Sequence, residues 1–341
     1  MTTGHRTGAR RTRACFVVVA AAAWLVAATT SRAEAQAWLP LSGEGAVVIQ
    51  LQDAFSRDHF VPVARVDIGH IYTKSLVFDA TYGVTDKIAV DVSLPYITSK
   101  YNGPQPHPTT LDDGTYHSTF QDLRFAVRYS ARAGKFAVAP FVTSILPSHR
   151  YQYYAHAAPG RRLRELQVGA YVAGLLEDLI PGAFVSVRVG YGFMQTVADV
   201  KHGRGMLDVE FGDFLTERFR VFAMGSGQLT NGGIDIPFVG PIGLPNVMRS
   251  EHDRIDRTHF LNIGGGASFS VTDSVDIFGS YVTSVANRNG HSLTRGINVG
   301  VSWSFKHRDA SAPDMAKMAA DTDWEAAARS LFKCVCQRGG K

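Results

Sequence analysis

The sequence predicts an all-β protein: a single up-and-down antiparallel transmembrane β-barrel of about 12 strands. Three observations lead to this prediction. Apolar and polar residues alternate with a period of two along most of the chain, and the connections between these runs are alternately short and long. In addition, the N-terminus carries an export signal.

The stretch 76–96, LVFDATYGVTDKIAVDVSLPY, shows the alternation most clearly. In its first run Phe78 and Tyr82 lie on one face and Asp79 lies on the other, and the second run alternates in the same way. The short polar turn 85–87 separates the two runs, so they are predicted to form an antiparallel hairpin.

The same alternation predicts twelve strands, near residues 43–52, 74–83, 87–100, 118–131, 134–147, 163–176, 182–195, 203–213, 217–230, 257–270, 274–286 and 293–305. The connections after strands 2, 4, 8 and 10 are tight, and the one after strand 6 is slightly longer. Those after strands 1, 3, 5 and 9 are long, beginning with the loop 53–73. Outer-membrane barrels have short periplasmic turns and longer outer loops, so both ends of the barrel are expected on the periplasmic side.

The two faces of the strands differ in polarity. On the last strand Ile297, Val301 and Trp303 share one face, whereas Asn298 and Ser302 share the other. A soluble sandwich would alternate as well, but its strands are usually about five or six residues long. Strands of about ten residues can cross a bilayer when tilted. Aromatic residues at the strand ends also suit the membrane interfaces, so the membrane barrel is favoured.

Residues 1–35 are predicted to be a cleavable signal peptide. Four arginines precede the apolar run 15–28, and two small-x-small sites follow it, Ala33-Glu34-Ala35 and Ala35-Gln36-Ala37. This run is too short to span a membrane, and no later stretch approaches about 20 apolar residues. Export and the barrel pattern together predict the bacterial cell outer membrane as the location, with outer-membrane lipid as a partner.

The net charge of +5 comes mostly from the signal peptide. Removal of residues 1–35 leaves 30 basic and 29 acidic residues, so electrostatics give no support to a nucleic-acid partner. Cys15 leaves with the signal peptide, and Cys334 and Cys336 lie near the C-terminus. No disulfide framework is therefore expected in the barrel.

Two phrases, YGVTDKIAVDVSLPY at 82–96 and FQDLRFAVRYS at 120–130, accompany the twelve-strand plan. Together they resemble the outer-membrane barrels of the phenol meta-cleavage pathway family, which are regarded as transporters for aromatic or other small apolar compounds. The resemblance spans roughly residues 40–305. It implies the same barrel fold and a transporter-like function, and it implies no catalytic residues.

If the apolar face meets lipid, the other face of each strand lines the interior. The lumen residues predicted in this way are Asp79, Asp91, Asp122, Arg124, Arg128, Arg188, Asp208 and Glu210. Charges of both signs at one depth are expected to pair across the lumen, with the aspartates of strands 2 and 3 balanced by the arginines of strands 4 and 7. Such pairs either stiffen the barrel or form a constriction that selects solutes, and the sequence leaves both possibilities open.

The loop 230–246, TNGGIDIPFVGPIGLPN, is apolar and rich in Gly and Pro. Exposed outer loops rarely carry so many large apolar side chains. It is a candidate gating loop that folds into the mouth, with its apolar residues Ile236, Phe238, Val239 and Leu244. Packing on neighbouring loops or on a second subunit fits the composition equally well, and the oligomeric state is not predicted.

Ten histidines lie in or beside the predicted outer loops. Their spacing matches no recognised metal site, so neither a metal nor another cofactor is predicted. Catalysis is not predicted either. His291 and Ser292 lie near a rim, where outer-membrane lipid hydrolases keep a Ser/His pair, but adjacent residues on a strand point to opposite faces.

Residues 306–341 depart from the barrel plan and are expected to form a periplasmic tail. Within it, 313–333 has the pattern of an amphipathic helix, and Cys334-Val335-Cys336 lacks the Cys-x-x-Cys-His spacing of c-type haem attachment. The predicted organisation is thus signal peptide 1–35, barrel 36–305 and tail 306–341.

These observations predict an outer-membrane channel or transporter for passive uptake or export of small solutes, with hydrophobic or aromatic compounds as candidates. Two alternatives stay open: a structural or partner-binding barrel and, less favoured, a lipid-modifying outer-membrane enzyme. The sequence does not identify the substrate.

Overall fold

The computed structural model describes residues 37–61, 64–133, 135–237 and 243–306. The predicted signal peptide and all but the first residue of the predicted tail lie outside these residues, as do Phe238 and Val239 of the candidate gating loop. The elements are β1 (Glu44–Val61), β2 (Ala64–Thr85), β3 (Ile88–Asn102), β4 (His117–Phe120), β5 (Asp122–Tyr129), β6 (Ala131–Ala133), β7 (Phe136–Pro147), β8 (Glu165–Leu175), β9 (Ala183–Met194), β10 (His202–Phe214), β11 (Phe219–Gly232), α2 (Asn246–Arg249), α3 (His252–Ile255), β12 (His259–Thr272), β13 (Val275–Arg288) and β14 (Gly290–Lys306).

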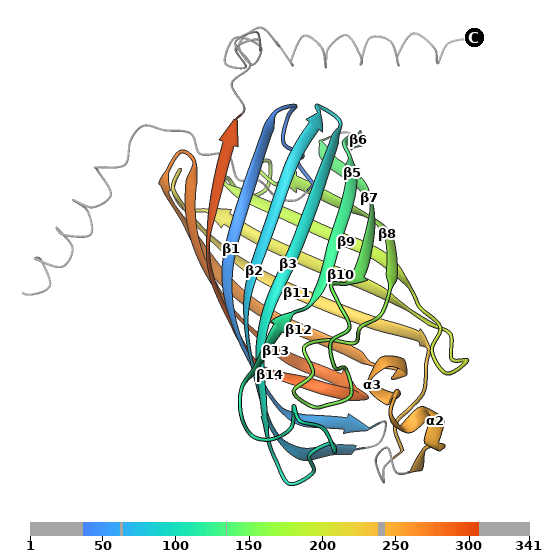
Figure 1. Cartoon of the computed structure of the whole chain (residues 1–341). Helices are drawn as coiled ribbons and strands as arrows, with labels where there is room; N and C mark the ends of the chain where they lie inside the picture. The colour runs from blue at the N-terminus through green and yellow to red at the C-terminus, as the bar shows by residue number, and fades with distance from the viewer. Residues whose placement is uncertain (1–36, 62–63, 134, 238–242, 307–341) are drawn as a thin grey trace, which may run out of the picture. The chain divides into compact units, whose positions relative to one another are not determined.

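The strands form one antiparallel sheet that closes on itself (Figure 1). Each strand pairs with its neighbours in the chain, and β14 pairs with β1 to complete the ring. β4, β5 and β6 are successive parts of a single strand that is interrupted at Gln121 and Ser130. The barrel therefore has twelve strands, which confirms the predicted fold class. Closure pairs backbone groups between strands, as a membrane interior requires.

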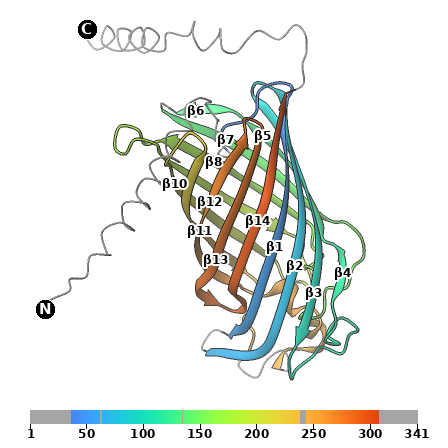
Figure 2. The same ribbon diagram turned by 90° about the vertical axis from the view of Figure 1, so that its left-hand side faces the viewer.

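The first hairpin is longer than its predicted strands. β1 and β2 stay paired from Gly45↔Tyr82 to Val61↔Ala64, so most of the predicted loop 53–73 is strand and the loop prediction was wrong. Figure 2 shows both strands continuing past β13 and β14 at one end of the barrel. Polar residues occupy both faces of this extension, for example Asp58 and His59, so the alternation that identifies a strand in the sequence is lost there.

The connections are sorted by length between the two ends of the barrel (Figure 1). Tight turns and the connection 176–182 lie at one end. The connection 195–201, which has the same length as 176–182, and the longer connections 103–116, 148–164 and 233–258 lie at the other end together with α2 and α3. Two connections at the loop end are short: residues 62–63 between β1 and β2, and Asn289 between β13 and β14. Asn289 and Gly290, the first residue of β14, both have positive φ. We call the described residues of 103–116, 148–164 and 233–258 the loop cap.

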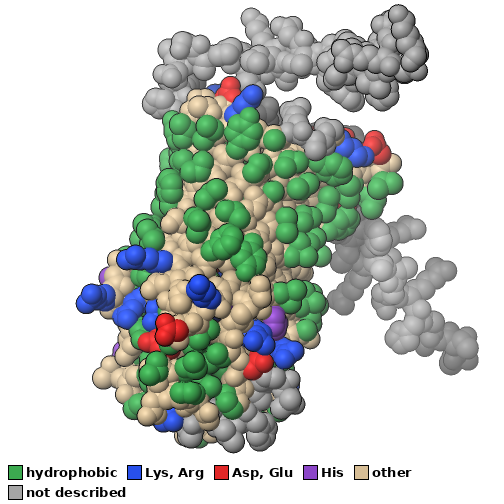
Figure 3. Space-filling model, turned by 90° about the vertical axis from the view of Figure 1, so that its right-hand side faces the viewer, with side chains coloured by type: hydrophobic (Ala, Val, Ile, Leu, Met, Phe, Trp, Pro, Cys, Tyr) green, Lys and Arg blue, Asp and Glu red, His purple; other side chains and the backbone are tan. Residues whose placement is uncertain are grey.

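The outward face of the barrel is apolar. Phe78, Val92, Ile263, Val299 and Trp303, from four different strands, are each between 40% and 54% exposed. Figure 3 shows hydrophobic side chains spread over the middle of the wall, whereas charged side chains gather toward its ends. A belt of this size is expected to face an apolar medium, because soluble monomers rarely expose such surfaces.

No helix among the described residues is both long enough and apolar enough to cross a membrane.

The segment before β1, residues 37–43, lies inside the barrel at its tight-turn end. Ala37 packs against the fully buried Ala173 of β8, and the Gly43 amide donates a hydrogen bond to the Gly83 carbonyl at 3.0 Å. Trp38 and Pro40 line the interior cavity. This segment therefore narrows the lumen from the side of the tight turns.

Candidate functional site

The barrel encloses a cavity of about 840 Å³. Seven of the eight predicted lumen residues line it, namely Asp79, Asp91, Arg124, Arg128, Arg188, Asp208 and Glu210. Asp122 is not among the lining residues. Its carboxylate accepts a hydrogen bond from the Tyr151 hydroxyl of the loop cap. Burial and this bond raise the pKa of Tyr151 well above its usual range, so the phenol keeps its proton.

Asp91 and Arg128 form a bidentate pair on neighbouring strands. Arg128 Nε and Nη2 donate to the two carboxylate oxygens at 2.7 and 2.6 Å, and the Thr81 hydroxyl donates to one of them at 2.7 Å. The Arg128 side chain is only 6% exposed. Planar guanidinium and carboxylate groups match in this geometry, so the pair is held in a single arrangement.

A second charged group lies on β8, β9 and β10. Arg188 stands opposite Asp208 in the strand register and donates to it at 2.8 Å, and it also donates to Gln167 at 2.8 Å. Arg204 makes a bidentate pair with Glu165 at 2.8 and 2.6 Å. These side chains form a continuous polar network along the wall.

The charges pair along the wall rather than across the lumen. The carboxylate of Asp79 accepts a hydrogen bond from Gln50 at 3.1 Å and forms no ion pair with another described residue. Of the ion pairs expected between these aspartates and arginines, only the one between Asp91 and Arg128 is found among the described residues. The physical reason is distance: side chains on neighbouring strands are about 5 Å apart, whereas opposite walls are separated by the width of the lumen.

Arg124 differs from the other lumen arginines. Its side chain is exposed to the cavity, and no hydrogen bond or ion pair joins it to another described residue. It faces the lumen near Asp79 and Arg188, whose charges act on it. Arg124 therefore offers an available cationic group to a solute in the cavity.

Aromatic rings lie beneath two of the paired arginines. The Arg188 guanidinium lies 5.1 Å from the Phe141 ring centre and 5.9 Å from that of Tyr171, and Arg128 lies 5.9 Å from the same tyrosine. Such cation–π contacts keep the guanidinium planes against the wall. The opposite part of the lining, on β12 to β14, is mainly hydroxyl and amide side chains: Ser268, Ser270, Ser280, Asn298, Ser302 and Ser304.

The predicted lumen set omitted Arg204, Gln167 and Tyr171. Each stands on the inward face of its strand, an even number of residues from a charged residue of the polar network on β8 to β10. For Arg204 this charged residue is Asp208, and for Gln167 and Tyr171 it is Glu165. The period of two was thus sufficient to find them.

The candidate gating loop packs onto its neighbours in its described part. Ile236 is 1% exposed, and its amide donates to Asn289 Oδ1 at 3.0 Å, while Asn289 Nδ2 donates to the Ile234 carbonyl at 3.0 Å. Leu244 is half-buried. These contacts fix the start of the loop to the turn between β13 and β14. A gating role stays a prediction.

The possible hydrolase pair does not meet in this structure. Ser292 Oγ accepts a hydrogen bond from Asn287 Nδ2 at 3.0 Å, and no hydrogen bond joins it to His291 among the described residues. A nucleophile and its base would have to lie within hydrogen-bonding distance.

Comparison with protein-family models finds no match, and a search of curated proteins finds none either. Solved structures do match. An outer membrane channel from Pseudomonas putida F1 superposes with a TM-score of 0.61 at 11% identity, over 80% of this chain and 100% of that chain. The shared fold is that of an outer-membrane β-barrel.

Two further matches have lower TM-scores. The translocator domain of the autotransporter NalP from Neisseria meningitidis gives 0.45 at 12% identity, over 87% of this chain and 96% of that chain. The NanC porin gives 0.44 at 10% identity, over 75% of this chain and 98% of that chain.

Proposed function

We propose that the protein is an outer-membrane channel through which small solutes move passively. The observation that carries this proposal is the contrast between an apolar outer belt and a charged, hydroxyl-rich cavity of about 840 Å³. Cavities of about 300–1,000 Å³ suit small molecules. The shared fold with an outer membrane channel of Pseudomonas putida F1 also supports it.

The lining favours solutes that combine an apolar ring with a polar or anionic group. Aromatic side chains such as Tyr171, Phe222 and Phe278 line the same cavity as Arg124. A ring can stack on the former while an oxygen or carboxylate meets the latter. The resemblance to the phenol meta-cleavage pathway barrels points to the same class of compound. No energy-coupling device is needed for this movement.

The loop cap gives some support to the alternative of a partner-binding barrel. Arg254, 8% exposed, donates to the carbonyls of Arg161 and Arg162 at 3.0 and 3.1 Å, and Tyr153 donates to Glu251 at 2.6 Å. These bonds lock the 148–164 and 233–258 connections together. A fixed outer surface of this kind could present a constant epitope to a partner.

Liposome swelling separates the two functions. The purified full-length protein is reconstituted, and influx of a neutral sugar, an aliphatic carboxylate and an aromatic carboxylate of similar mass is compared. We expect the aromatic anion to enter fastest, because it alone can use both the rings and the cationic group of the lining.

Fractionation provides the control for location. Recovery in the outer membrane, with gel migration that changes on heating, is expected for a closed barrel. Recovery as a soluble periplasmic protein would contradict the membrane assignment, and a folded barrel that passes none of the three solutes would favour the partner-binding alternative.

A further inference from the structure

Five histidines that are far apart in the sequence meet at the loop end of the barrel, and we call them the His cluster: His59, His107, His156, His252 and His291. They come from β1, from the connections 103–116 and 148–164, from α3 and from β14. Neighbouring ring centres are 4.2 to 5.7 Å apart, so the rings form a continuous group. Imidazole is the commonest nitrogen ligand for transition metals in proteins.

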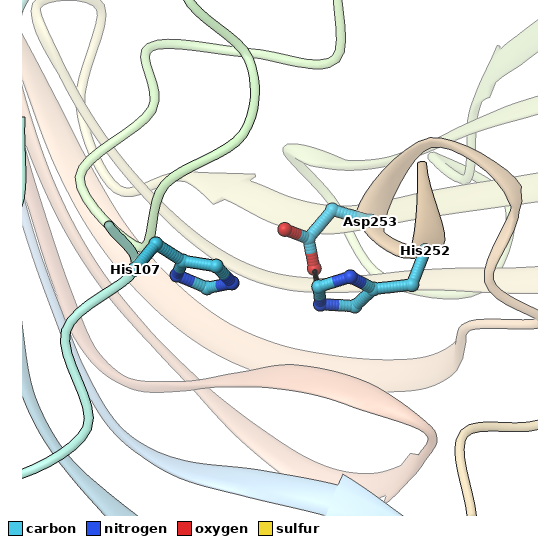
Figure 4. Close-up of side chains that lie close together, drawn as sticks. All are labelled: His107, His252 and Asp253. Carbon is cyan, nitrogen blue, oxygen red and sulfur yellow. Dashed lines mark ion pairs between the residues drawn. The ribbon is translucent and has the colours of Figure 1, made fainter. Parts of the chain in front are cut away.

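Two aspartates border the His cluster, the half-buried Asp253 and the buried Asp112. Asp253 Oδ1 lies 3.1 Å from His252 Nε2, and Asp112, whose side chain is fully buried, lies 3.1 Å from His107 Nδ1. One donor atom each of His107, His252 and Asp253 lies within 4.8 Å of the other two. Figure 4 shows the three side chains converging from two separate connections, with one nitrogen of the His107 ring facing Asp253 and His252.

The orientation of His252 is fixed by a hydrogen bond on the far side of its ring. His252 Nδ1 lies 2.6 Å from the Arg249 carbonyl, which can only accept, so Nδ1 carries the hydrogen. The ring is 2% exposed and cannot easily turn. Its Nε2 is thereby directed toward Asp253. A backbone carbonyl that holds the second ring nitrogen is the usual support of a metal-bound histidine.

His107 has the same kind of support from a carboxylate. Asp112 accepts backbone N–H bonds from His107, His156 and Ala157 at 2.9 to 3.1 Å. The Asp112 carboxylate lies 3.1 Å from His107 Nδ1 and can accept its hydrogen, which leaves the lone pair of Nε2 facing His252 and Asp253.

We propose that the loop cap binds one divalent first-row transition-metal ion, such as Zn²⁺, through His107 Nε2, His252 Nε2 and the Asp253 carboxylate. Ligand atoms about 2.0–2.2 Å from zinc are about 3.3 Å from one another, so the three donors need to approach by about 1.5 Å at most. His252 has to offer the lone pair of Nε2 to the ion. Where Nε2 carries a hydrogen toward Asp253, that N–H bond breaks on binding: the electron pair stays on nitrogen to bind the metal, and the proton is released to solvent.

Buried ring nitrogens next to these three residues support the assignment. His59 Nε2 and His291 Nδ1 are buried and have no hydrogen-bond partner among the described residues. Their rings are 4.8 Å apart, and His291 lies 5.7 Å from His156. Buried polar atoms in native proteins are almost always satisfied. If one of these nitrogens coordinates a nearby ion, directly or through water, it gains the partner that it otherwise lacks.

A second set of donors lies close by. His107 Nδ1, His156 Nδ1 and Asp112 Oδ2 are 2.9 to 3.1 Å from one another. The same Asp112 oxygen already accepts two backbone N–H bonds, however, so it has little capacity left for an ion. The proposed set uses Asp112 and His156 as supporting residues, and their role is tested separately.

The site would link two connections of the loop cap, because His107 precedes β4 and His252 precedes β12. A bound ion would therefore act as a clamp on the outer surface. This proposal does not depend on solute passage, and its test measures metal binding rather than permeability.

The test uses the full-length protein in detergent, with no polyhistidine tag, titrated with Co²⁺ and then with Zn²⁺. We expect one equivalent of each metal, a Co²⁺ visible absorption band that Zn²⁺ abolishes, and at least tenfold weaker binding in His252→Ala and in the isosteric Asp253→Asn. His117→Ala is the matched control. This histidine also lies 2.9 Å from an aspartate, Asp113, but its side chain is 31% exposed and does not belong to the His cluster, so its removal should leave the affinity unchanged.

Heat-modifiable migration confirms that each variant is a folded barrel. His156→Ala distinguishes the two donor sets: retained stoichiometry with weaker binding supports the proposed ligands. Loss of binding in His156→Ala together with full binding in His252→Ala would overturn them in favour of the alternative set. Absence of saturable Co²⁺ and Zn²⁺ binding to the folded wild-type protein would overturn the site itself.

Discussion

The lumen wall and the loop cap both hold charged side chains away from bulk solvent, but they are assembled differently. In the wall, Asp91 and Arg128 stand on neighbouring strands, and strand register alone brings them together. In the cap, His107 and His252 come from connections more than a hundred residues apart, and they meet only because the loops pack. Charge pairing in the wall therefore follows from secondary structure, whereas in the cap it follows from tertiary structure.

This difference has a consequence for stability. The wall pairs belong to a closed sheet, so breaking one is expected to disturb the barrel at a single place. The cap has little regular structure, and Asp112 alone receives three backbone N–H bonds from two connections. Single substitutions are expected to have their largest effects there, and those effects should stay within the loops.

The largest effect is expected for Asp112→Asn. The amide cannot accept the full set of hydrogen bonds, and loss of a buried charge with its partners typically costs about 3–5 kcal/mol. We expect faster protease cleavage of 103–116 and 148–164, while heat-modifiable migration of the barrel is kept. Asp113→Asn, an exposed neighbour, is the control and should leave cleavage unchanged. If protease cleaves the two variants at the same rate, the central role of Asp112 in the loop cap is contradicted.

An intermediate effect is expected for Arg128→Ala. The change leaves Asp91 with one hydroxyl partner, Thr81. Because Asp91 is 26% exposed to the lumen, the cost should be about 1–3 kcal/mol of barrel stability, less than for a dry pair. The measurement is the midpoint of urea unfolding in detergent.

Lys135→Ala breaks an exposed pair with Asp178 at a tight turn and serves as the control for the wall. It should cost less than about 1 kcal/mol. If the two substitutions shift the midpoint equally, the wall pairs contribute no more than surface pairs do.

Arg124→Ala is expected to have the smallest effect on barrel stability, because Arg124 pairs with no other described residue. Its effect should appear in ion selectivity instead. A unit charge about 7 Å from an ion in water contributes about 0.6 kcal/mol, or a two- to threefold change in the anion-to-cation permeability ratio. Reversal potentials in a salt gradient measure this ratio. Unchanged selectivity would remove Arg124 from the solute path.

The sequence was sufficient for the wall because each strand has a period of two. Asp79, Arg188 and Glu210 were placed in the lumen from alternation alone, and all three line the cavity. What alternation could not show is the choice of partner. Asp79 meets Gln50 rather than an arginine, because the offset between β1 and β2 is set by the turn and not by local pattern.

The sequence was insufficient for the cap, because loops have no such period. No spacing relates His59 to His252 or to His291, so their meeting at one place had no signal in the sequence. The extension of β1 and β2 was missed for a related reason. Outside the belt both faces of a strand meet water, and the polarity difference disappears.

The most direct test of the channel assignment is single-channel recording with the wild-type protein in a planar bilayer. A solute path through the barrel predicts discrete conductance steps, which an aromatic carboxylate reduces in a concentration-dependent manner by occupying the cavity. A folded barrel that inserts into the bilayer and gives no conductance with any electrolyte would contradict it.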